Sequence, residues 1–263
     1  MEFDRRDILP SLFAMAAILL TCVRVQAQGV TPADSSRKWE ITDNSFLVEE
    51  AFNQEAGVVQ NIFTWTKARD GTWAANFTQE WPAPGMRHQL SYSLVYLNNG
   101  EGNGIGDALL NYRFQLREET AGGPAISPRL SLILPTGRED EGLGEGSVGV
   151  DLNLPVSKQF GDFYLHANAG YTWLPDVPRT HELPTGLWRG AASGIWRVAP
   201  MLNLMLEGLV GFGEFATVSP GFRRGWNFGE RQLVIGAAIP VTRADNRWTA
   251  ALLTYFSYEL PFR

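Results

Sequence analysis

The stretch that decides the fold runs from Asp107 to Arg117 and reads Asp-Ala-Leu-Leu-Asn-Tyr-Arg-Phe-Gln-Leu-Arg. Its apolar residues recur with a period of two, which indicates a β-strand rather than a helix. The apolar face consists of Ala108, Leu110, Tyr112, Phe114 and Leu116. The opposite face consists of Asp107, Asn111, Arg113, Gln115 and Arg117, with Leu109 as the one exception. A face this polar suits a water-filled interior better than a sandwich core, so we interpret the chain as a membrane-spanning β-barrel.

The same alternation recurs from residue 59 to the C-terminus and predicts twelve strands. Most are near the ~9–11 residues that a tilted strand needs to cross a bilayer. The predicted strands are Val59–Arg69, Thr72–Trp81, Arg87–Leu97, Gly106–Arg117, Ser127–Leu134, Ser147–Ser157, Asp162–Trp173, Trp188–Val198, Met201–Gly211, Phe215–Gly225, Glu230–Val241 and Thr249–Phe262. The predicted fold is therefore all-β, an antiparallel up-and-down transmembrane barrel of about 12 strands, with about 10 or 14 as alternatives.

The connections between these strands fall on two sides of the barrel. The long ones are Asn98–Ile105, Pro135–Gly146 and Leu174–Leu187; the short ones are Lys158–Gly161, Ala199-Pro200 and Trp226–Gly229. The hairpin signal Asp70-Gly71 falls on the long-loop side as an exception, and the last connection is assigned to Thr242–Trp248. With an even strand count both termini lie on the short-turn side, as in outer-membrane barrels.

The N-terminus has the pattern of a secretory signal peptide over residues 1–27. Arg5 and Arg6 precede an apolar run, and Val25-Gln26-Ala27 is a small-residue cleavage site. The alternative is a single anchoring helix, for which the run is short. The only cysteine, Cys22, leaves with the signal in this interpretation.

Residues 28–57 form a periplasmic leader in this interpretation, and residues 58–263 form the barrel. Helix-forming residues between Phe46 and Gly57 predict either a short plug helix at the barrel mouth or an ordinary lead-in loop.

Composition agrees with this assignment and excludes other classes. The 263 residues are 44% hydrophobic, and after the first 25 residues no stretch approaches the ~20 consecutive apolar residues that a spanning helix needs. The net charge is −6, and removal of residues 1–27 leaves it unchanged, because three basic and three acidic residues are lost together. A mildly acidic exported chain without a basic cluster is a poor nucleic-acid binder.

Aromatic residues lie at the ends of the predicted strands and at the C-terminus. Tryptophans at the predicted strand ends fit interfacial belts, with a substrate slide of aromatic side chains as the alternative. The last strand alternates up to Phe262, a terminal aromatic of the kind that the barrel-insertion machinery reads; Arg263 follows it. We therefore expect an outer-membrane location in a Gram-negative bacterium, with outer-membrane lipid, lipopolysaccharide and the insertion machinery as partners.

Several short motifs, in order, also resemble a known family. They are the segment from Phe46 to Gln60, Gly104-Ile105-Gly106-Asp107, Pro135-Thr136-Gly137, Val218-Ser219-Pro220-Gly221 and the ending Tyr258-Glu259-Leu260-Pro261-Phe262. Together they are similar to outer-membrane proteins labelled as belonging to the meta-pathway of phenol degradation. The resemblance runs from about Phe46 to Phe262 and implies a barrel that moves hydrophobic or aromatic small molecules. It implies no catalytic residues.

Enzyme and metal motifs are not recognisable in the sequence, and no cofactor is expected. A serine and a histidine from separate strands could still form a barrel lipase, so an enzyme acting on lipids is the alternative to a channel. A sealed structural barrel without transport is a further alternative to a channel. The acidic loop with Glu139, Asp140, Glu141 and Glu145 suits a solvated loop better than a Ca²⁺ or lipopolysaccharide-bridging site.

The predicted functional surface is the lumen. By strand parity nine charged or titratable residues face it: Asp107, Arg113, Arg117, Asp151, His166, Arg189, Arg197, Glu207 and Glu259. Mixed charges there either select solutes or pair with one another to stabilise a filled interior. The preferred function is a channel or uptake protein for small, hydrophobic or aromatic solutes.

Overall fold

The computed structural model describes residues 40–41, 45–175 and 186–262. The predicted signal peptide, the beginning of the leader and most of the Leu174–Leu187 connection lie outside the described residues. In the described ranges no helix combines the length and the apolarity that crossing a membrane requires.

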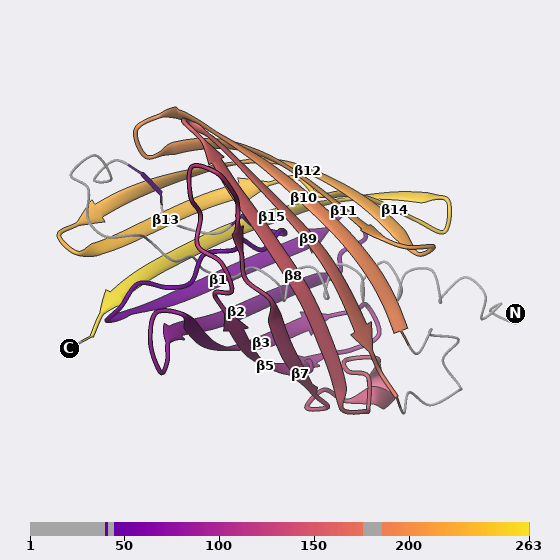
Figure 1. The fold of residues 1–263 in the computed structure, drawn as a ribbon. Coiled ribbons are helices and arrows are strands. Elements are labelled where there is room, and N and C mark those ends of the chain that lie inside the picture. Colours follow the sequence, from indigo (N-terminus) through magenta and orange to yellow (C-terminus); the bar gives the residue numbers. More distant parts are fainter. Residues whose placement is uncertain (1–39, 42–44, 176–185, 263) are drawn as a thin grey trace, which may run out of the picture.

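The described chain folds into one antiparallel sheet of fifteen strands that closes on itself (Figure 1). The strands are β1 (Val58–Ala68), β2 (Trp73–Pro82), β3 (His88–Asn98), β4 (Asn103–Ile105), β5 (Ala108–Phe114), β6 (Ala125–Ile126), β7 (Arg129–Leu134), β8 (Gly149–Phe160), β9 (Phe163–Trp173), β10 (Gly186–Ala199), β11 (Leu202–Gly211), β12 (Phe215–Phe228), β13 (Arg231–Ala238), β14 (Val241–Ala244) and β15 (Arg247–Pro261). The first and last long strands, β1 and β15, pair from Val58↔Pro261 to Ala68↔Ala251, which completes the barrel.

Three of the spanning strands are each interrupted once. β4 and β5 both pair with β3, β6 and β7 both pair with β8, and β13 and β14 both pair with β12 and β15. Pro128 and Pro240 lie in two of these interruptions, where a residue without an N–H cannot donate to the ladder. Fifteen segments therefore form twelve spanning strands, and the predicted number is confirmed.

Four predicted connections on this path are longer than those in the structure. β4 pairs with β3 as far as Asn98↔Asn103, so the first is the turn Asn99–Gly102 instead of Asn98–Ile105. β8 continues to Phe160, so the turn before β9 is Gly161-Asp162 instead of Lys158–Gly161. β12 continues to Phe228, so the turn before β13 is shorter than Trp226–Gly229. The last connection is the two-residue turn Asp245-Asn246 instead of Thr242–Trp248. Both turn residues have positive φ, 48° and 61°, as a tight hairpin turn requires.

The two faces of the strands have opposite environments, as the sequence predicts. Leu110 and Tyr112 are 49% and 39% exposed on the outer surface. Arg113, the next residue after Tyr112, is 1% exposed. Most of the exposed side chains on the outside of the cylinder are apolar, and most of the polar side chains of the strands face its interior. A cluster of apolar side chains, including Ile195, Leu209 and Leu253, shares the interior. This inversion of a soluble protein's pattern is typical of a barrel with lipid outside.

Residues Ser45–Gly57, which we call the lumen segment, run inside the barrel. The segment has no regular secondary structure, so of the two alternatives the helix is wrong. Ile41, which precedes the segment, lies against Gly225 near the turns after β10 and β12. Ser45 lies beside Ser193 midway along β10, Glu49 reaches β8 and β9, and Gly57 leads into β1. Since Ile41 and Gly57 both lie at the short-turn end and the residues from Ser45 to Glu49 lie midway along the barrel, the chain forms an arch inserted from that end.

Candidate functional site

Wall side chains hold the backbone of the lumen segment in place of helical hydrogen bonds. Six of its N–H groups donate to side chains on the strands: Leu47 and Val48 to Glu207, Glu49 to Asn168, Ala51 to Ser157, Asn53 to Gln115 and Gln54 to Gln89. Buried backbone N–H groups must find acceptors, and here the polar face of the barrel supplies them. This explains why helix-forming residues do not form a helix.

The first half of the lumen segment is fixed by contacts with β10, β11 and β15. The hydroxyls of Ser45 and Ser193 lie 2.8 Å apart. One carboxylate oxygen of Glu207 accepts from the Leu47 and Val48 N–H groups at 2.8 and 3.1 Å. Phe46 is fully buried, with its ring centroid 4.8 Å from that of Tyr255.

Arginines from two neighbouring strands surround the middle of the lumen segment. The Glu49 carboxylate lies 3.7 Å from Arg113 Nη1 and 3.6 Å from Arg129 Nε. Asn153 on β8 donates its amide to the same carboxylate. Arg113 also donates to Asn53 Oδ1 and to the Glu50 carbonyl, both at 3.0 Å. Two arginines thus hold an arch that carries the neighbouring carboxylates Glu49 and Glu50.

In a second cluster in the lumen, Asp151 on β8 is bonded to side chains on three other strands, β7, β9 and β10. Its carboxylate accepts from Arg129 Nη2 at 2.9 Å, from Arg189 Nη2 at 2.7 Å and from the Thr172 hydroxyl at 2.7 Å. All these charged groups are nearly or fully buried, so each depends on its partner for stabilisation.

A third polar group lies next to Glu49 and consists of Ser157, His166 and Glu50. The Ser157 hydroxyl lies 2.8 Å from His166 Nδ1, and Glu50 Oε1 lies 3.6 Å from His166 Nε2. The Ser157 oxygen also accepts from the Ala51 N–H. The group therefore faces the lumen and is covered by the lumen segment, away from lipid.

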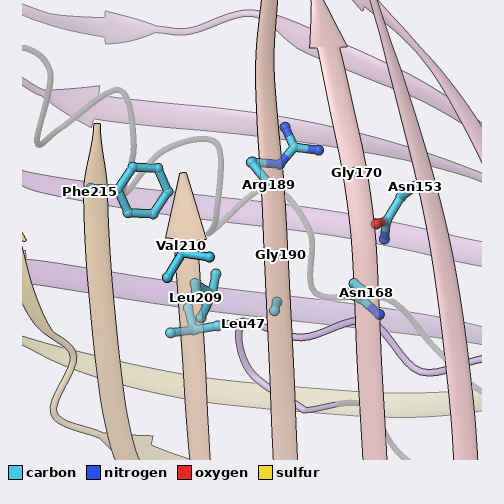
Figure 2. Close-up of a pocket in the computed structure, with 10 residues that line it drawn as sticks. Leu47, Asn153, Asn168, Gly170, Arg189, Gly190, Leu209, Val210 and Phe215 are labelled. Carbon is cyan, nitrogen blue, oxygen red and sulfur yellow. The ribbon is translucent and has the colours of Figure 1, made fainter. Parts of the chain in front are cut away.

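A pocket lies in the lumen between the wall and Leu47 (Figure 2). Its cavity volume is about 20 Å³ while the lumen segment is docked, which is room for about one water molecule. Apolar groups of Leu47, Leu209 and Phe215 line part of it, and Asn153, Asn168 and Arg189 line the rest. Since Arg189, Leu209 and Phe215 lie near the long-loop ends of their strands, the pocket is in that half of the barrel.

The connection between β7 and β8 folds inward over the long-loop mouth. Leu143 is buried against Val95 and Leu97. Asp107 accepts hydrogen bonds from the N–H groups of Gly137 at 3.0 Å and Glu145 at 2.8 Å. The short 3₁₀ turn Glu139–Glu141 lies in this connection.

Burial raises the pKa of the Glu145 carboxyl to about 7, and the neighbouring Asp107 carboxylate adds to the rise. The pKa of Asp107 is also raised by burial, although the backbone hydrogen bonds at Glu145 and Gly137 oppose the rise. Among the described residues, no three acidic, histidine or cysteine side chains gather where they could hold a metal ion.

The structure brings together five of the nine predicted lumen residues: Arg113, Asp151, His166, Arg189 and Glu207 are all buried around or beside the lumen segment. Asp107 lies at the long-loop mouth, and Arg117 is exposed beyond the end of β5. Arg197 is partly exposed and pairs with Glu40 and Asp162. Glu259 is partly exposed near the end of β15.

Sequence reasoning missed Arg129, Arg223, Glu80, Glu49 and Glu50. The inward direction of the first three could have been predicted from the strand alternation. Arg129, for example, alternates with Leu130 and Leu132 in the same pattern as Arg113 does with its apolar neighbours. The two segment carboxylates carry no such signal, because their chain has no strand period.

These features define a class of protein: a twelve-stranded outer-membrane-type barrel whose polar lumen holds an N-terminal arch. The chain belongs to the family described as "Putative MetA-pathway of phenol degradation", whose pattern matches residues 37–256. No curated protein matches the sequence.

Solved structures of outer-membrane proteins are similar to the chain to different degrees. An outer-membrane channel from Pseudomonas putida F1 is similar with a TM-score of 0.59 and 13% identity, over 89% of this chain and 100% of that chain. Outer membrane phospholipase A from Escherichia coli gives 0.46 at 10% identity, over 84% and 95%. The CymD monoaromatic hydrocarbon channel gives 0.44 at 8% identity, over 79% and 89%. Only the first likeness is strong enough to support the barrel fold.

Proposed function

We propose that the protein is an outer-membrane channel for small hydrophobic or aromatic solutes, closed at rest by its lumen segment. The observation that carries this proposal is the way the interior is filled. A separate arch, held by hydrogen bonds and ion pairs to wall side chains, occupies space that wall side chains alone fill in a smaller barrel of about eight strands. Such an arch can leave without breaking the strand pairing.

The pocket beside Leu47 supports the choice of solute. With the lumen segment docked its volume is about 20 Å³, so a solute fits there after the segment, with Leu47, has left. Leu209 and Phe215 supply an apolar wall, and Asn168 and Arg189 supply polar groups that orient a ligand. The family's label and the monoaromatic hydrocarbon named for CymD are consistent with such a solute.

The alternative enzyme function has one observation in its favour, the Ser157–His166 hydrogen bond. A lipid hydrolase needs its serine at the lipid or at the outer rim, whereas this serine is buried under Ala51. We therefore assign the pair to holding the segment. Lipase activity that is present in the wild type and abolished by His166→Ala would support the enzyme instead.

In the membrane, we propose that the long-loop end faces outward, toward lipopolysaccharide, and that the alternating strand β15 is read by the insertion machinery. Export depends on the predicted signal peptide, residues 1–27.

Planar-bilayer recording tests the channel directly. Purified protein is expected to give discrete current steps with closed intervals, because the arch closes the lumen in its docked position. A heat-modifiable, correctly folded barrel that never conducts would leave the sealed structural barrel as the better account.

A further inference from the structure

We infer that the barrel wall carries a binding site for an organic carboxylate, formed by Arg113, Arg129 and Asn153, and that Glu49 of the lumen segment occupies it in this structure. The inference deepens the proposed function, since the channel supplies the route by which a solute reaches the site. Binding itself can be measured without conduction.

The three wall residues form a built anion site. Arg113, Arg129 and Asn153 are 1%, 3% and 6% exposed, and all three converge on one carboxylate. An arginine pair with an amide donor is a strong arrangement for a carboxylate, since guanidinium groups present several N–H donors in a fixed geometry.

Glu49 satisfies this site incompletely. Its carboxylate lies 3.6 and 3.7 Å from the two guanidinium groups, which is beyond hydrogen-bond length. Among the described residues, Arg129 Nε, Arg129 Nη1 and Glu49 Oε1 have no hydrogen-bond partner although all three atoms are buried. Buried donors without acceptors are costly, so a carboxylate free to orient itself can bind these arginines better than one tethered to the arch.

The charges of the lumen support replacement of Glu49 by an anion. The buried wall charges are four arginines (Arg113, Arg129, Arg189, Arg223) and three carboxylates (Glu80, Asp151, Glu207), a formal +1. The two carboxylates of the lumen segment, Glu49 and Glu50, change this to −1. When the arch withdraws, the wall it leaves is positive, and an organic anion can restore the balance.

The neighbouring pocket indicates what the rest of the ligand is. Asn153 donates to Glu49 and also lines the pocket with Leu209 and Phe215. Asp151 bridges Arg129 to Arg189, which lines the same pocket. The pocket measures about 20 Å³ with Leu47 in place. Once the arch has withdrawn and Leu47 has left, a carboxylate on Arg129 places the adjoining part of its ligand against Leu209 and Phe215. The ligand class that fits both halves is a small aromatic monocarboxylate.

Titration calorimetry of the detergent-purified full chain tests the inference, with benzoate as the probe and benzamide as its neutral analogue. Glu49→Gln keeps the shape of the side chain but removes the competing charge, so benzoate is expected to bind about tenfold or more tightly than to the wild type. Benzamide binding is expected to stay the same. The matched control, Glu55→Gln, removes one charge from the same segment outside the arginine site and is expected to bind benzoate as the wild type does.

Adding Arg129→Met to Glu49→Gln is expected to abolish the gain. Each protein is first checked for heat-modifiable gel migration; if Glu49→Gln does not fold, Glu49→Asp, whose carboxylate is one methylene farther from Arg129, is expected to give a smaller gain in the same direction. Benzoate binding that ignores Glu49, or a gain that survives Arg129→Met, overturns the site. A lack of conductance with benzoate binding intact would contradict the channel alone.

Discussion

At the scale of single residues, Arg113 connects the barrel wall to the lumen segment mainly through hydrogen bonds. Its guanidinium donates to the Asn53 side chain, the Glu50 and Phe52 carbonyls and Gln89, so one side chain fixes three positions of the arch. An arginine is suited to this because its five N–H donors point in fixed directions.

Replacement of Arg113 by methionine is expected to destabilise the protein by about 3 kcal/mol, because Glu49 and two backbone carbonyls lose a buried partner. The measurement is the free energy of unfolding by urea in lipid vesicles. Arg117→Met is the matched control, since Arg117 has the same parity but is exposed, and its effect is expected to stay within about 0.5 kcal/mol. Equal effects at the two positions would argue against the network.

Glu145 gives the long-loop mouth a pH dependence. The pKa of its carboxyl is raised from 4.5 to about 7, so its protonated form is the one that the folded loop favours. The contribution to stability is fully present below pH 4.5 and is lost as the pH rises through about 7.

Protection factors for amide hydrogen exchange in the connection between β7 and β8, which are corrected for the intrinsic pH dependence of exchange, are therefore expected to be higher at pH 5 than at pH 8. Glu145→Gln is expected to remove this difference. Glu141→Gln, whose parent carboxylate is paired with Arg138, serves as the control and should keep the difference. Lower protection factors at pH 5 than at pH 8 would reverse the assigned sign.

At the scale of elements, the strands and the lumen segment differ in how their structure is encoded. A strand carries its own period of two, so strand positions, the inward side of Arg113 and the outward side of Leu110 follow from the sequence. The lumen segment takes its conformation from acceptors on distant strands, such as Glu207 and Ser157, and no local pattern announces them. The last predicted connection is too long for a related reason: Val241–Ala244 reads Val-Thr-Arg-Ala, which has no alternation of apolar and polar residues, although it pairs with β12 and β15.

Phe46 is the apolar anchor of the lumen segment. Phe46→Ala removes a fully buried ring from its contact with Tyr255 and is expected to weaken docking of the segment by about 3 kcal/mol. Limited proteolysis within residues 45–57, followed in folded protein, measures this as faster cleavage. Phe222→Ala removes a ring from the lipid-facing side, where it is 51% exposed, and should leave cleavage unchanged. Identical cleavage of both variants would show that the ring does not hold the arch.

At the scale of the whole molecule, the barrel separates lipid from a polar interior. Leu154 lies about halfway along β8 (Gly149–Phe160) and is 43% exposed on the outer face. Leu154→Arg is expected to cost about 2–4 kcal/mol in unfolding free energy in lipid vesicles, since a charge near the bilayer midplane is costly.

Val148 precedes the same strand, so Val148→Arg serves as the depth control and is expected to cost at most about 1 kcal/mol. If both arginines are tolerated equally, lipid does not cover this face.

The central claim is that the lumen segment closes a channel and must move for it to conduct. Ser45 and Ser193 have hydroxyls 2.8 Å apart, so cysteines at both positions can form a disulfide with little movement. The test is single-channel recording of Ser45→Cys/Ser193→Cys in a Cys22→Ser background, before and after reduction, with Ser45→Cys alone as the control. The account predicts that the oxidised protein stays closed and that reduction restores the wild-type current, whereas an oxidised protein that conducts like the wild type would contradict it.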